Sequence, residues 1–399
     1  MLNNNLIYLD NNATTKVDEK VLEKMLPYFC EEYANPSSMY DFSRKASSAI
    51  KEARETMRDF FNAKSANEII FTSCGSEGAN TAIRGLLSAD KTKKHIITTK
   101  VEHPCVLNVF KYYEKQGYRV DYIGVNSNGE LDLEELSSKV DDETALVATM
   151  WANNETGVIF PVEKISKIVK DKNPNTKLFV DAVQVAGKID IDVQKADIDM
   201  LSVSGHKFHA PKGVGALYVK AGTMLNPLII GGHQERGKRA GTENVPYIVG
   251  IAEAARLAKE SLGFEATEIK RLRDKLENGL IKNICNAKLN TGVANRVPNT
   301  SNIGFEYIEG ELILLHLSDV GICASSGSAC TSGSLEPSHV LRAMGTPFTA
   351  LHGSIRFSLS RFTTEDEIDY VIAKMPPIIE KLNSISPYQD EIMALKNSK

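Results

Sequence analysis

The stretch DMLSVSGHKFHAPKGVGALYV, residues 199–219, decides the fold. Its apolar runs Met200–Ser204 and Gly215–Val219 predict two strands, because both are short and are bounded by turn residues. The polar turn between them contains Lys207, which directly follows His206. Burial of this lysine would lower its pKa, and a neutral amine is a nucleophile that can form a Schiff base. The alternative is an ordinary β-hairpin whose lysine carries no chemistry.

Composition restricts the class of protein. With 399 residues, 42% of them apolar, the chain is long enough for two or three domains and a large core. A net charge of −4 gives no bulk attraction to nucleic acid or to an anionic membrane. The six cysteines have no regular spacing, which argues against a disulfide framework and a metal site and favours a reducing compartment. Because the N-terminus has no signal-peptide pattern and no apolar run approaches about 20 residues, we expect a cytoplasmic protein without membrane or nucleic-acid partners.

Short strand patterns alternate with helical patterns from residue 69 to residue 219. The expected strands are Ile69–Ser73, His95–Thr99, Arg119–Ile123, Ala145–Trp151, Leu178–Val180, Met200–Ser204 and Ala216–Val219. Several are continuous apolar runs, which is typical of strands covered on both faces. The helical segments between them predict βαβ units and therefore an α/β fold with a mainly parallel sheet. In such a sheet the functional site lies at the carboxyl ends of the strands.

The pattern changes after about Pro246. A helical stretch from Ile248 to about Cys285 has no strand interruption and predicts a bridge into a second domain. The elements expected there are strands near Ser301–Phe305 and Ser354–Leu359, a helix after the capping-box pattern at Thr364 that Pro376 and Pro377 should kink or break, and a frayed tail from Asn383. We expect a large domain of residues 15–259, and a smaller α+β domain of residues 1–14 and 260–399.

Polar residues follow the predicted strands at the ends where the site is expected. Cys74–Asn80 opens a helix with small residues, and is either a phosphate-binding helix N-terminus or an ordinary cap. Asn153–Gly157 follows the strand Ala145–Trp151 and offers hydrogen bonds to a ring or a carboxylate. Asp181 is either a cap or the carboxylate partner of a pyridinium nitrogen. Together with Lys207, these are the parts that pyridoxal phosphate (PLP) requires.

Three further residues suggest chemistry. His103 follows the strand His95–Thr99, and is either structural or a proton carrier stacked on a ring, since the pKa of histidine lies near neutrality. Residues 323–337 are mostly small, which predicts a mobile loop, and within it Cys330 is an accessible thiol suited to nucleophilic chemistry. Arg356 lies on a predicted strand, and a buried arginine needs an anion such as a substrate carboxylate.

These residues stand in segments that resemble a NifS-type cysteine desulfurase, a class V enzyme of the fold-type-I PLP family. The matching segments are YLDNNATT (8–15), NPSS (35–38), EHP (102–104), NNETG (153–157), DAVQ (181–184), SGHKFHAPKG (204–213), ERGKRAGTENV (235–245), SSGSACTSGSLEPSHVLRAMG (325–345) and SIRFSLSR (354–361). They cover nearly the whole chain, and the lysine and cysteine segments are highly specific. The resemblance implies a fold-type-I large domain with a seven-stranded sheet, and a small domain that carries the Cys330 loop.

The resemblance also implies a role for each matching residue. Lys207 would hold PLP covalently and act as the proton-transfer base, and Cys330 would be the nucleophile. The other implied contacts are Asp181 to the pyridinium nitrogen, Gln184 and Asn154 near the ring hydroxyl, His103 above the ring, Gly75, Ser76, Ser204 and His206 to the phosphate, Thr242 to the phosphate of the neighbouring subunit in a homodimer, and Arg356 with Asn154 to the substrate carboxylate. No metal is implied.

The implied reaction converts L-cysteine to L-alanine and leaves sulfur as a persulfide on Cys330, for transfer to an iron–sulfur scaffold protein. Residues 239–244 and the segment around Cys330 resemble the nitrogen-fixation branch, which favours sulfur supply for nitrogenase clusters, and Gln234 stands where many housekeeping relatives have histidine. The alternatives are a housekeeping desulfurase and a selenocysteine lyase or class V aminotransferase, which would not need the Cys330 loop. A non-enzymatic docking scaffold for cluster-assembly proteins is an alternative of another kind.

Overall fold

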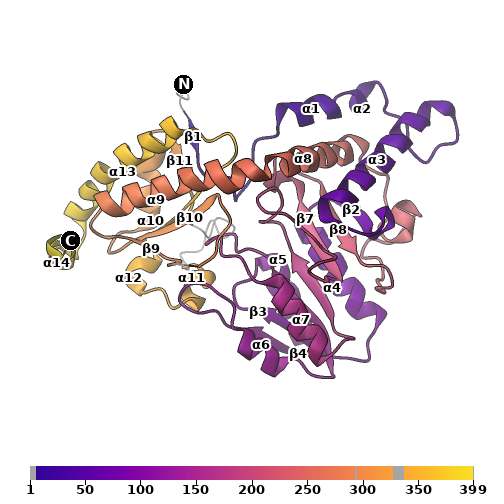
Figure 1. The fold of residues 1–399 in the computed structure, drawn as a ribbon, viewed down its shortest axis with the longest axis horizontal. Helices are drawn as coiled ribbons and strands as arrows, with labels where there is room; N and C mark the ends of the chain where they lie inside the picture. The colour runs from indigo at the N-terminus through magenta and orange to yellow at the C-terminus, as the bar shows by residue number, and fades with distance from the viewer. Residues whose placement is uncertain (1–5, 293, 327–336, 399) are drawn as a thin grey trace.

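The computed structural model describes residues 6–292, 294–326 and 337–398, and a seven-stranded sheet runs through its right-hand part in Figure 1. In spatial order its strands are β2 (Ile69–Thr72), β8 (Gly215–Val219), β7 (Met200–Ser204), β6 (Lys177–Asp181), β5 (Thr144–Met150), β3 (His95–Thr99) and β4 (Arg119–Ile123). Strand β8 is antiparallel to both its neighbours, and the other pairings are parallel. The predicted mainly parallel sheet is confirmed, and each strand begins and ends within one residue of its predicted bounds.

The two faces of the sheet pack into different hydrophobic clusters, because successive side chains of a strand point to opposite faces. On β7, for example, Met200 belongs to one cluster and Leu201 to the other. The first face is covered by α4 (Gly75–Ala89) and α5 (Pro104–Lys115). The second is covered by α1 (Glu19–Met25), α3 (Arg44–Phe61), α6 (Leu133–Lys139), α7 (Val162–Lys172) and α8 (Val245–Phe264). Cover on both faces explains why the strands are continuous apolar runs.

The C-terminal part of the chain forms a separate core around a second sheet, in the order β12-β10-β9. Its elements are β9 (Ala287–Leu289), β10 (Thr300–Phe305), β12 (Ser354–Ser358), α9 (Lys270–Asn283), α10 (Gly310–Asp319) and α13 (Glu365–Ile385). Ile7 and Leu9 share this core, since β1 (Ile7–Tyr8) pairs with β11 (Ile322–Cys323). We therefore keep residues 1–14 and 260–399 as the proposed small domain, and 15–259 as the large one.

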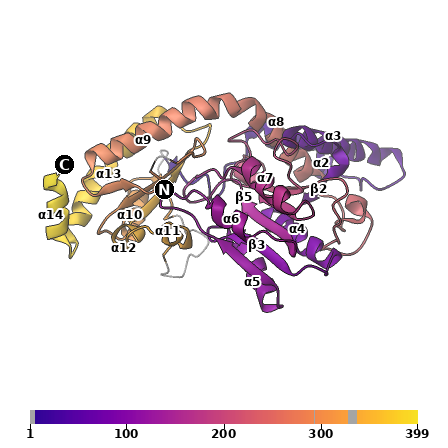
Figure 2. The ribbon, with the colours of Figure 1, turned by 60° about the horizontal axis from the view of Figure 1, so that its bottom comes forward.

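One long helix joins the two cores. Helix α8 continues through a π-helical turn, Glu265–Ile269, into α9, and Figure 2 shows the two helices running along the top of the molecule toward α13. The remaining helices are α2 (Pro27–Cys30), α11 (His339–Ala343), α12 (Phe348–Leu351) and α14 (Gln389–Ser398). Within the described ranges, no helix has the length and apolarity required to cross a membrane.

Two expectations about the C-terminus, a helix broken at the prolines and a frayed tail, are wrong. Pro376 and Pro377 do not break α13, which continues to Ile385. Buried side chains on one face of this helix, Val371, Met375, Ile379 and Leu382, anchor it on the second core on both sides of the prolines, so that packing outweighs the lost backbone hydrogen bonds. The tail after Asn383 is not frayed either, since it forms α14 against α13.

Close packing of α4 on the sheet requires glycine at position 78. A Cβ atom there would lie 2.2 Å from Ser202 Oγ and 3.0 Å from Ser202 Cβ on β7. Ser202 is buried, so an added methyl group would have to displace the helix or the strand. The first turn of α4 is thereby held close to the carboxyl end of β7, which Lys207 follows.

We predict that Gly78→Ala lowers the free energy of unfolding by about 1–3 kcal/mol, because the methyl group overpacks the contact with Ser202. Urea unfolding followed by circular dichroism measures this loss. Gly263→Ala on α8 is the matched control, because an added Cβ there has no neighbour within 4 Å. It should be neutral or stabilising by up to about 1 kcal/mol through helix propensity. Equal losses in the two variants would show that helix–sheet packing is not the cause.

Candidate active site

The carboxyl ends of β5, β6 and β7 open into a cavity of about 380 Å³. The residues that the sequence predicted for the site and that line this cavity are Gly75, Ser76, His103, Asn154, Asp181, Gln184, Ser204, His206, Lys207 and Arg356. Thr242 does not line it and is exposed on the segment before α8. Cys330 lies outside the described residues. Residues far apart in the sequence therefore meet at one place, as expected for the carboxyl edge of a parallel sheet.

Lys207 ends a short 3₁₀ turn, Gly205–Lys207, directly after β7. Its Nζ donates hydrogen bonds to the carbonyl oxygens of Asn12 at 2.6 Å and Ala13 at 2.8 Å. The β-hairpin of the alternative interpretation does exist, because β7 and β8 are antiparallel neighbours. Its lysine nevertheless lines the cavity, so it is not an ordinary surface residue. The two carbonyl acceptors were missed from the sequence. Their only signal was the segment YLDNNATT, which contains both residues.

Asp181 closes β6 and is buried, with 7% of its surface exposed. Its Oδ1 accepts the backbone N–H of Val183 at 3.0 Å, and the thiol of Cys105 lies 3.9 Å from Oδ2. Burial raises the pKa of Asp181, and the proximity of His103, the hydrogen bond from Val183 and the charge of Lys207 oppose this shift. A cationic group in the cavity would stabilise the carboxylate further, as expected for the partner of a pyridinium nitrogen.

His103 is the N-cap of α5, and its Nδ1 accepts the backbone N–H of Cys105 at 3.2 Å. This contact fixes the neutral tautomer with the proton on Nε2. Burial lowers the pKa of His103, which the carboxylate of Asp181 opposes, so the ring is neutral at pH 7. His103 therefore combines a structural role, as a helix cap, with a position at the cavity.

One end of the cavity is suited to a phosphate group. Gly75 and Ser76 begin α4, where backbone N–H groups have no intrahelical acceptor and the helix carries a partial positive charge. The cap of this helix is Cys74, whose Sγ accepts the N–H of Glu77 at 3.5 Å. A Cβ at Gly75 would lie 2.9 Å from Val183 Cγ2, so the glycine keeps this edge of the cavity open. A phosphate site and a helix cap, the two interpretations of this segment, are thus compatible.

Ser204 and His206 lie on either side of the first residue of the lysine turn, and both line the cavity. Nδ1 of His206 lies 3.1 Å from Thr14 Oγ1. Burial, followed by the nearby charges of lysine side chains that include Lys207, lowers the pKa of His206 to about 4. At neutral pH His206 is uncharged, so it offers a phosphate a hydrogen bond without adding a positive charge.

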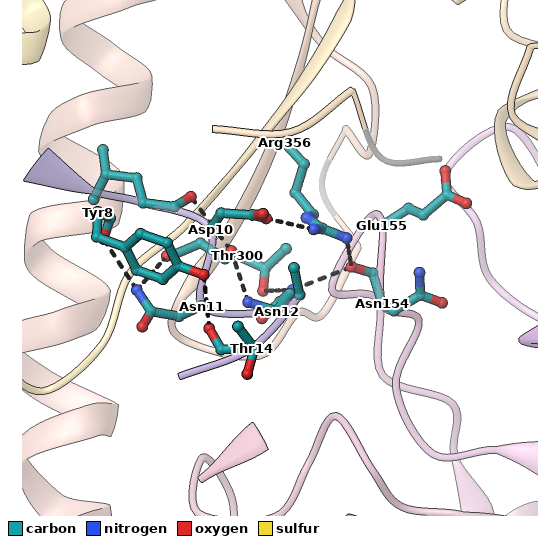
Figure 3. A network of polar contacts seen from close by, with 12 residues as sticks. Tyr8, Asp10, Asn11, Asn12, Thr14, Asn154, Glu155, Thr300 and Arg356 are labelled. Carbon is teal, nitrogen blue, oxygen red and sulfur yellow. Dashed lines mark hydrogen bonds and ion pairs between the residues drawn. The ribbon is translucent and has the colours of Figure 1, made fainter. Parts of the chain in front are cut away.

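Arg356 on β12 is a buried guanidinium, with 2% of its surface exposed, which the sequence predicted. Its Nη2 donates to Asp10 Oδ1 at 2.6 Å and its Nη1 to the carbonyl oxygen of Asn154 at 3.0 Å (Figure 3). Arg356 Nε is buried and has no hydrogen-bond partner within the described part of the chain. The ion pair with Asp10 was missed from the sequence.

Gln184, through its side chain, and Asn154, through its backbone carbonyl oxygen, both contact Asn12. Gln184 lines the cavity, but its Nε2 donates to the carbonyl oxygen of Asn12 at 3.1 Å. The carbonyl oxygen of Asn154 accepts Asn12 Nδ2 at 3.1 Å in addition to Arg356 (Figure 3). Asn12, for which no role was predicted, is therefore the residue that links Gln184, Asn154 and Lys207.

Both ends of the segment around Cys330 are attached beside the cavity. Ser325 exchanges two backbone hydrogen bonds with Arg356, of 2.6 and 3.2 Å. Ser338 Oγ donates to Glu155 Oε2 at 2.5 Å and caps α11. His339 Nε2 lies 3.0 Å from the carbonyl oxygen of Glu102. The residues before and after 327–336 are thus fixed to the arginine strand and to the segment next to His103.

The cavity residues fit PLP. The Lys207 amine suits the aldehyde of PLP, and the buried Asp181 carboxylate suits its ring nitrogen. The helix N-terminus at Gly75 suits its phosphate. Arg356 adds a buried cation for a carboxylate. In the part of the chain that the structure describes, no group of three or more metal-ligating side chains comes together.

We predict that Asp10→Asn lowers the free energy of unfolding by about 1–3 kcal/mol, because it leaves the buried Arg356 with a neutral partner. Glu260→Gln is the matched control. Glu260 also lies 2.6 Å from an arginine, Arg256, but the two side chains are 62% and 47% exposed, so its loss should stay within about 0.5 kcal/mol. Urea unfolding of both variants measures the difference. A loss in Asp10→Asn as small as in the control would contradict a buried, structurally important ion pair.

Comparison with known proteins identifies the family. Residues 7–371 match the family model described as Aminotransferase class-V. A "Cysteine desulfurase" of Nostoc sp. is 57% identical over 97% of this chain and 96% of the relative, and "Cysteine desulfurase NifS" of Azotobacter vinelandii is 52% identical over 96% and 94%. A solved "NIFS-LIKE PROTEIN" has a TM-score of 0.89 and 42% identity, covering 95% of this chain and all of that chain. "SspA in complex with cysteine" has a TM-score of 0.77 and 35% identity, covering 90% of this chain and all of that chain. The chain therefore belongs to the class-V aminotransferase family, as a PLP-dependent enzyme of the NifS-type cysteine desulfurase group.

Proposed function

We propose that this cysteine desulfurase binds L-cysteine in the cavity at Lys207 and moves its sulfur to Cys330. The products are L-alanine and a persulfide on Cys330: the C–S bond of the substrate breaks, a bond forms between the substrate sulfur and Cys330 Sγ, and protons return to the carbon product. The observation that carries the proposal is the meeting of a hydrogen-bonded lysine, a buried aspartate and a buried arginine in one cavity.

The residues proposed to hold PLP are those that line the cavity. Lys207 would bond to the aldehyde carbon, Asp181 would face the ring nitrogen and His103 would stack on the ring. Gly75, Ser76, Ser204 and His206 would bind the phosphate, and Gln184 and Asn154 would lie near the ring hydroxyl. When bound, PLP supplies an electron sink that stabilises the negative charge formed when the substrate loses its α-proton.

Arg356 is proposed to bind the substrate carboxylate, with help from Asn154. Its guanidinium borders the cavity, while Asp10 and the Asn154 carbonyl oxygen hold its two terminal nitrogens. The planar group is thereby fixed before substrate arrives, which reduces the entropy lost on binding. Asp10 also offsets the cost of keeping the guanidinium buried, since an unpaired buried charge is strongly unfavourable.

Protons are proposed to move through Lys207 and His103. The carbonyl oxygens of Asn12 and Ala13 hold the Lys207 amine at a defined place when it carries a proton. His103 carries its proton on Nε2, so at the start of the reaction it is a proton donor. It accepts a proton from a thiol only after the contact between its Nδ1 and the Cys105 N–H is broken. A thiolate on Cys330 is therefore better formed with the help of the substrate itself.

We also propose a homodimer in which Thr242 reaches the phosphate of the neighbouring subunit. Thr242 is exposed and away from the cavity of its own chain, as such a role requires. Large apolar side chains that a second copy could cover are also exposed, among them Tyr33 (67%), Met39 (101%) and Ile230 (85%). Buried in a dimer, these side chains would contribute apolar area in the way expected of a stable interface.

For the sulfur acceptor we propose an iron–sulfur scaffold protein of nitrogenase-type cluster assembly, in the cytoplasm. Similarity to the relative named NifS supports this branch, as do residues 239–244. The described cysteines are all free thiols, which suits a reducing compartment. A housekeeping cluster-assembly role is the alternative, and transfer of sulfur from the loaded protein to purified scaffolds of the two kinds distinguishes them.

We predict that exposure to L-cysteine adds one sulfur atom to the peptide that contains Cys330, as measured by mass spectrometry. Cys330→Ser should lose both this addition and the release of alanine, because no other residue is proposed to attack the substrate sulfur. Cys323→Ser is the control, since it removes a nearby thiol and should leave both intact. Alanine release without sulfur on Cys330 would favour chemistry of the selenocysteine lyase type, and a keto acid in place of alanine would favour an aminotransferase.

We predict that Arg356→Lys raises KM for L-cysteine by about 10- to 100-fold, because lysine cannot form the two parallel hydrogen bonds of a guanidinium. Steady-state kinetics with alanine as the measured product tests this, and kcat should change less than KM. An unchanged KM in a variant that retains the wild-type melting temperature would place the substrate carboxylate elsewhere.

A further inference from the structure

The turn 205–209, which carries Lys207, is closed by a hydroxyl group from the N-terminal segment. Thr15 Oγ1 donates to the carbonyl oxygen of His206 at 3.0 Å and accepts the backbone N–H of His209 at 2.8 Å. The same hydroxyl therefore bonds the residue before the lysine and the second residue after it. Thr15 is only 4% exposed, so water competes little for these hydrogen bonds. Lys207 thus lies within a closed hydrogen-bonded loop.

Three further hydrogen bonds attach the turn to the same segment. The N–H of Thr15 donates to the carbonyl oxygen of His206 at 2.9 Å, and the N–H of Asp18 donates to that of His209 at 3.1 Å. The ring of His209 adds a contact, because its Nδ1 donates to the carbonyl oxygen of Lys16 at 2.9 Å. Each of these bonds reaches one side of the lysine, whereas the Thr15 hydroxyl reaches both sides.

The turn contains a strained residue. His209 has a backbone φ of +73°, in the left-handed region that residues other than glycine rarely adopt. Its side chain is buried, and its ring packs edge-on against Phe362 with the ring centroids 5.0 Å apart. A strained backbone persists only where the surrounding structure determines it, and such residues are concentrated at active sites. The hydrogen bond from the His209 N–H to Thr15 restrains this backbone directly.

Thr15 is close to the active-site lysine without being part of the active-site cavity. It lines a separate small internal cavity of about 20 Å³, which Lys207 and His209 also border. The carbonyl oxygens that hold the Lys207 amine belong to Asn12 and Ala13, which precede Thr15 in the same segment. This segment therefore holds the lysine at two places, at its amine and at its backbone turn. Loss of the Thr15 hydroxyl would release the turn and leave the acceptors of the amine in place.

We propose that Thr15 is a positioning residue that acts through Lys207: its hydroxyl bridges His206 and His209 and so fixes the strained turn from which the lysine side chain enters the active-site cavity. This inference rests on the proposed function, in which Lys207 is the residue that bonds to PLP. The amine bonds to the aldehyde carbon, with release of water, only when it lies within reach of that carbon, so a fixed turn keeps a larger fraction of the chains competent. Without the hydroxyl, the buried N–H of His209 has lost its acceptor, which favours other conformations of the turn.

The test measures how fast the full-length chain, freed of cofactor, captures PLP, followed by visible absorbance. Thr15→Val removes the hydroxyl and keeps the shape of the side chain. We expect it to slow capture by about 5- to 30-fold, the range expected when one or two buried hydrogen bonds are lost. Thr15→Ser keeps the hydroxyl and should restore capture to a rate close to that of the wild type. Capture by Thr15→Ser as slow as by Thr15→Val would contradict the role of the hydroxyl.

The matched control is Thr176→Val. Thr176 is fully buried, and its Oγ1 donates to the carbonyl oxygen of Thr144 at 2.8 Å. It directly precedes β6, so it lies at the opposite end of the parallel strands from Lys207. Urea unfolding should show a loss of stability in both valine variants, whereas Thr176→Val should capture PLP at the wild-type rate. Similar slowing in the two variants would indicate a general effect of lost stability and would overturn the proposal.

Borohydride treatment of the wild-type protein with PLP separately tests the proposed function, which fails if no pyridoxyl group is fixed on Lys207. If the group is fixed, an unchanged rate of capture in folded Thr15→Val overturns the role of Thr15. If Thr15→Val does not fold, Thr15→Ala takes its place with the same expectation. If neither variant folds, the hydroxyl is required by the fold as a whole, which overturns a role specific to Lys207.

Discussion

The N-terminal segment from Asp10 to Thr15 is the constraint on which the site depends, because it is bonded to both cores. On one side its flanking residue Leu9 donates to the carbonyl oxygen of Cys323 at 2.9 Å, and Asp10 pairs with Arg356. On the other side Thr15 N–H donates to the carbonyl oxygen of His206 at 2.9 Å. The carbonyl oxygens of Asn12 and Ala13, between these anchors, hold Lys207. A single short segment therefore sets the position of the lysine relative to the arginine.

Burial controls the charges of the cavity. Desolvation keeps His103 and His206 neutral and raises the pKa of Asp181, while Arg356 is paired with Asp10. Burying these groups is costly for the folded protein, since charged and polar atoms lose water. A cofactor and a substrate that supply the missing charges offset part of this cost, and ligands that bind only the folded state stabilise it. The polar groups of the cavity are thus arranged for ligands rather than for stability.

The segment that contains Cys330 is tied to the same structure at both ends. Ser325 pairs with the backbone of Arg356, and Ser338 donates to the buried carboxylate of Glu155. Glu155 follows Asn154, whose carbonyl oxygen holds Arg356. The groups proposed to bind the substrate carboxylate and the attachment points of the nucleophile's segment are therefore one connected unit.

The sequence by itself determined the sheet and most of the site. Continuous apolar runs such as Met200–Ser204 specify buried strands, and residues at or just beyond the ends of such strands, Asp181 and Lys207 among them, must meet at one edge because parallel strands end together. Only the tertiary structure decided the partners of these residues. Asp10 and Arg356 are 346 positions apart and Asn12 and Lys207 are 195 apart, and no periodicity in a sequence encodes contacts between two cores. The uninterrupted α13 has the same cause, since packing on the second core overrides the local effect of Pro376 and Pro377.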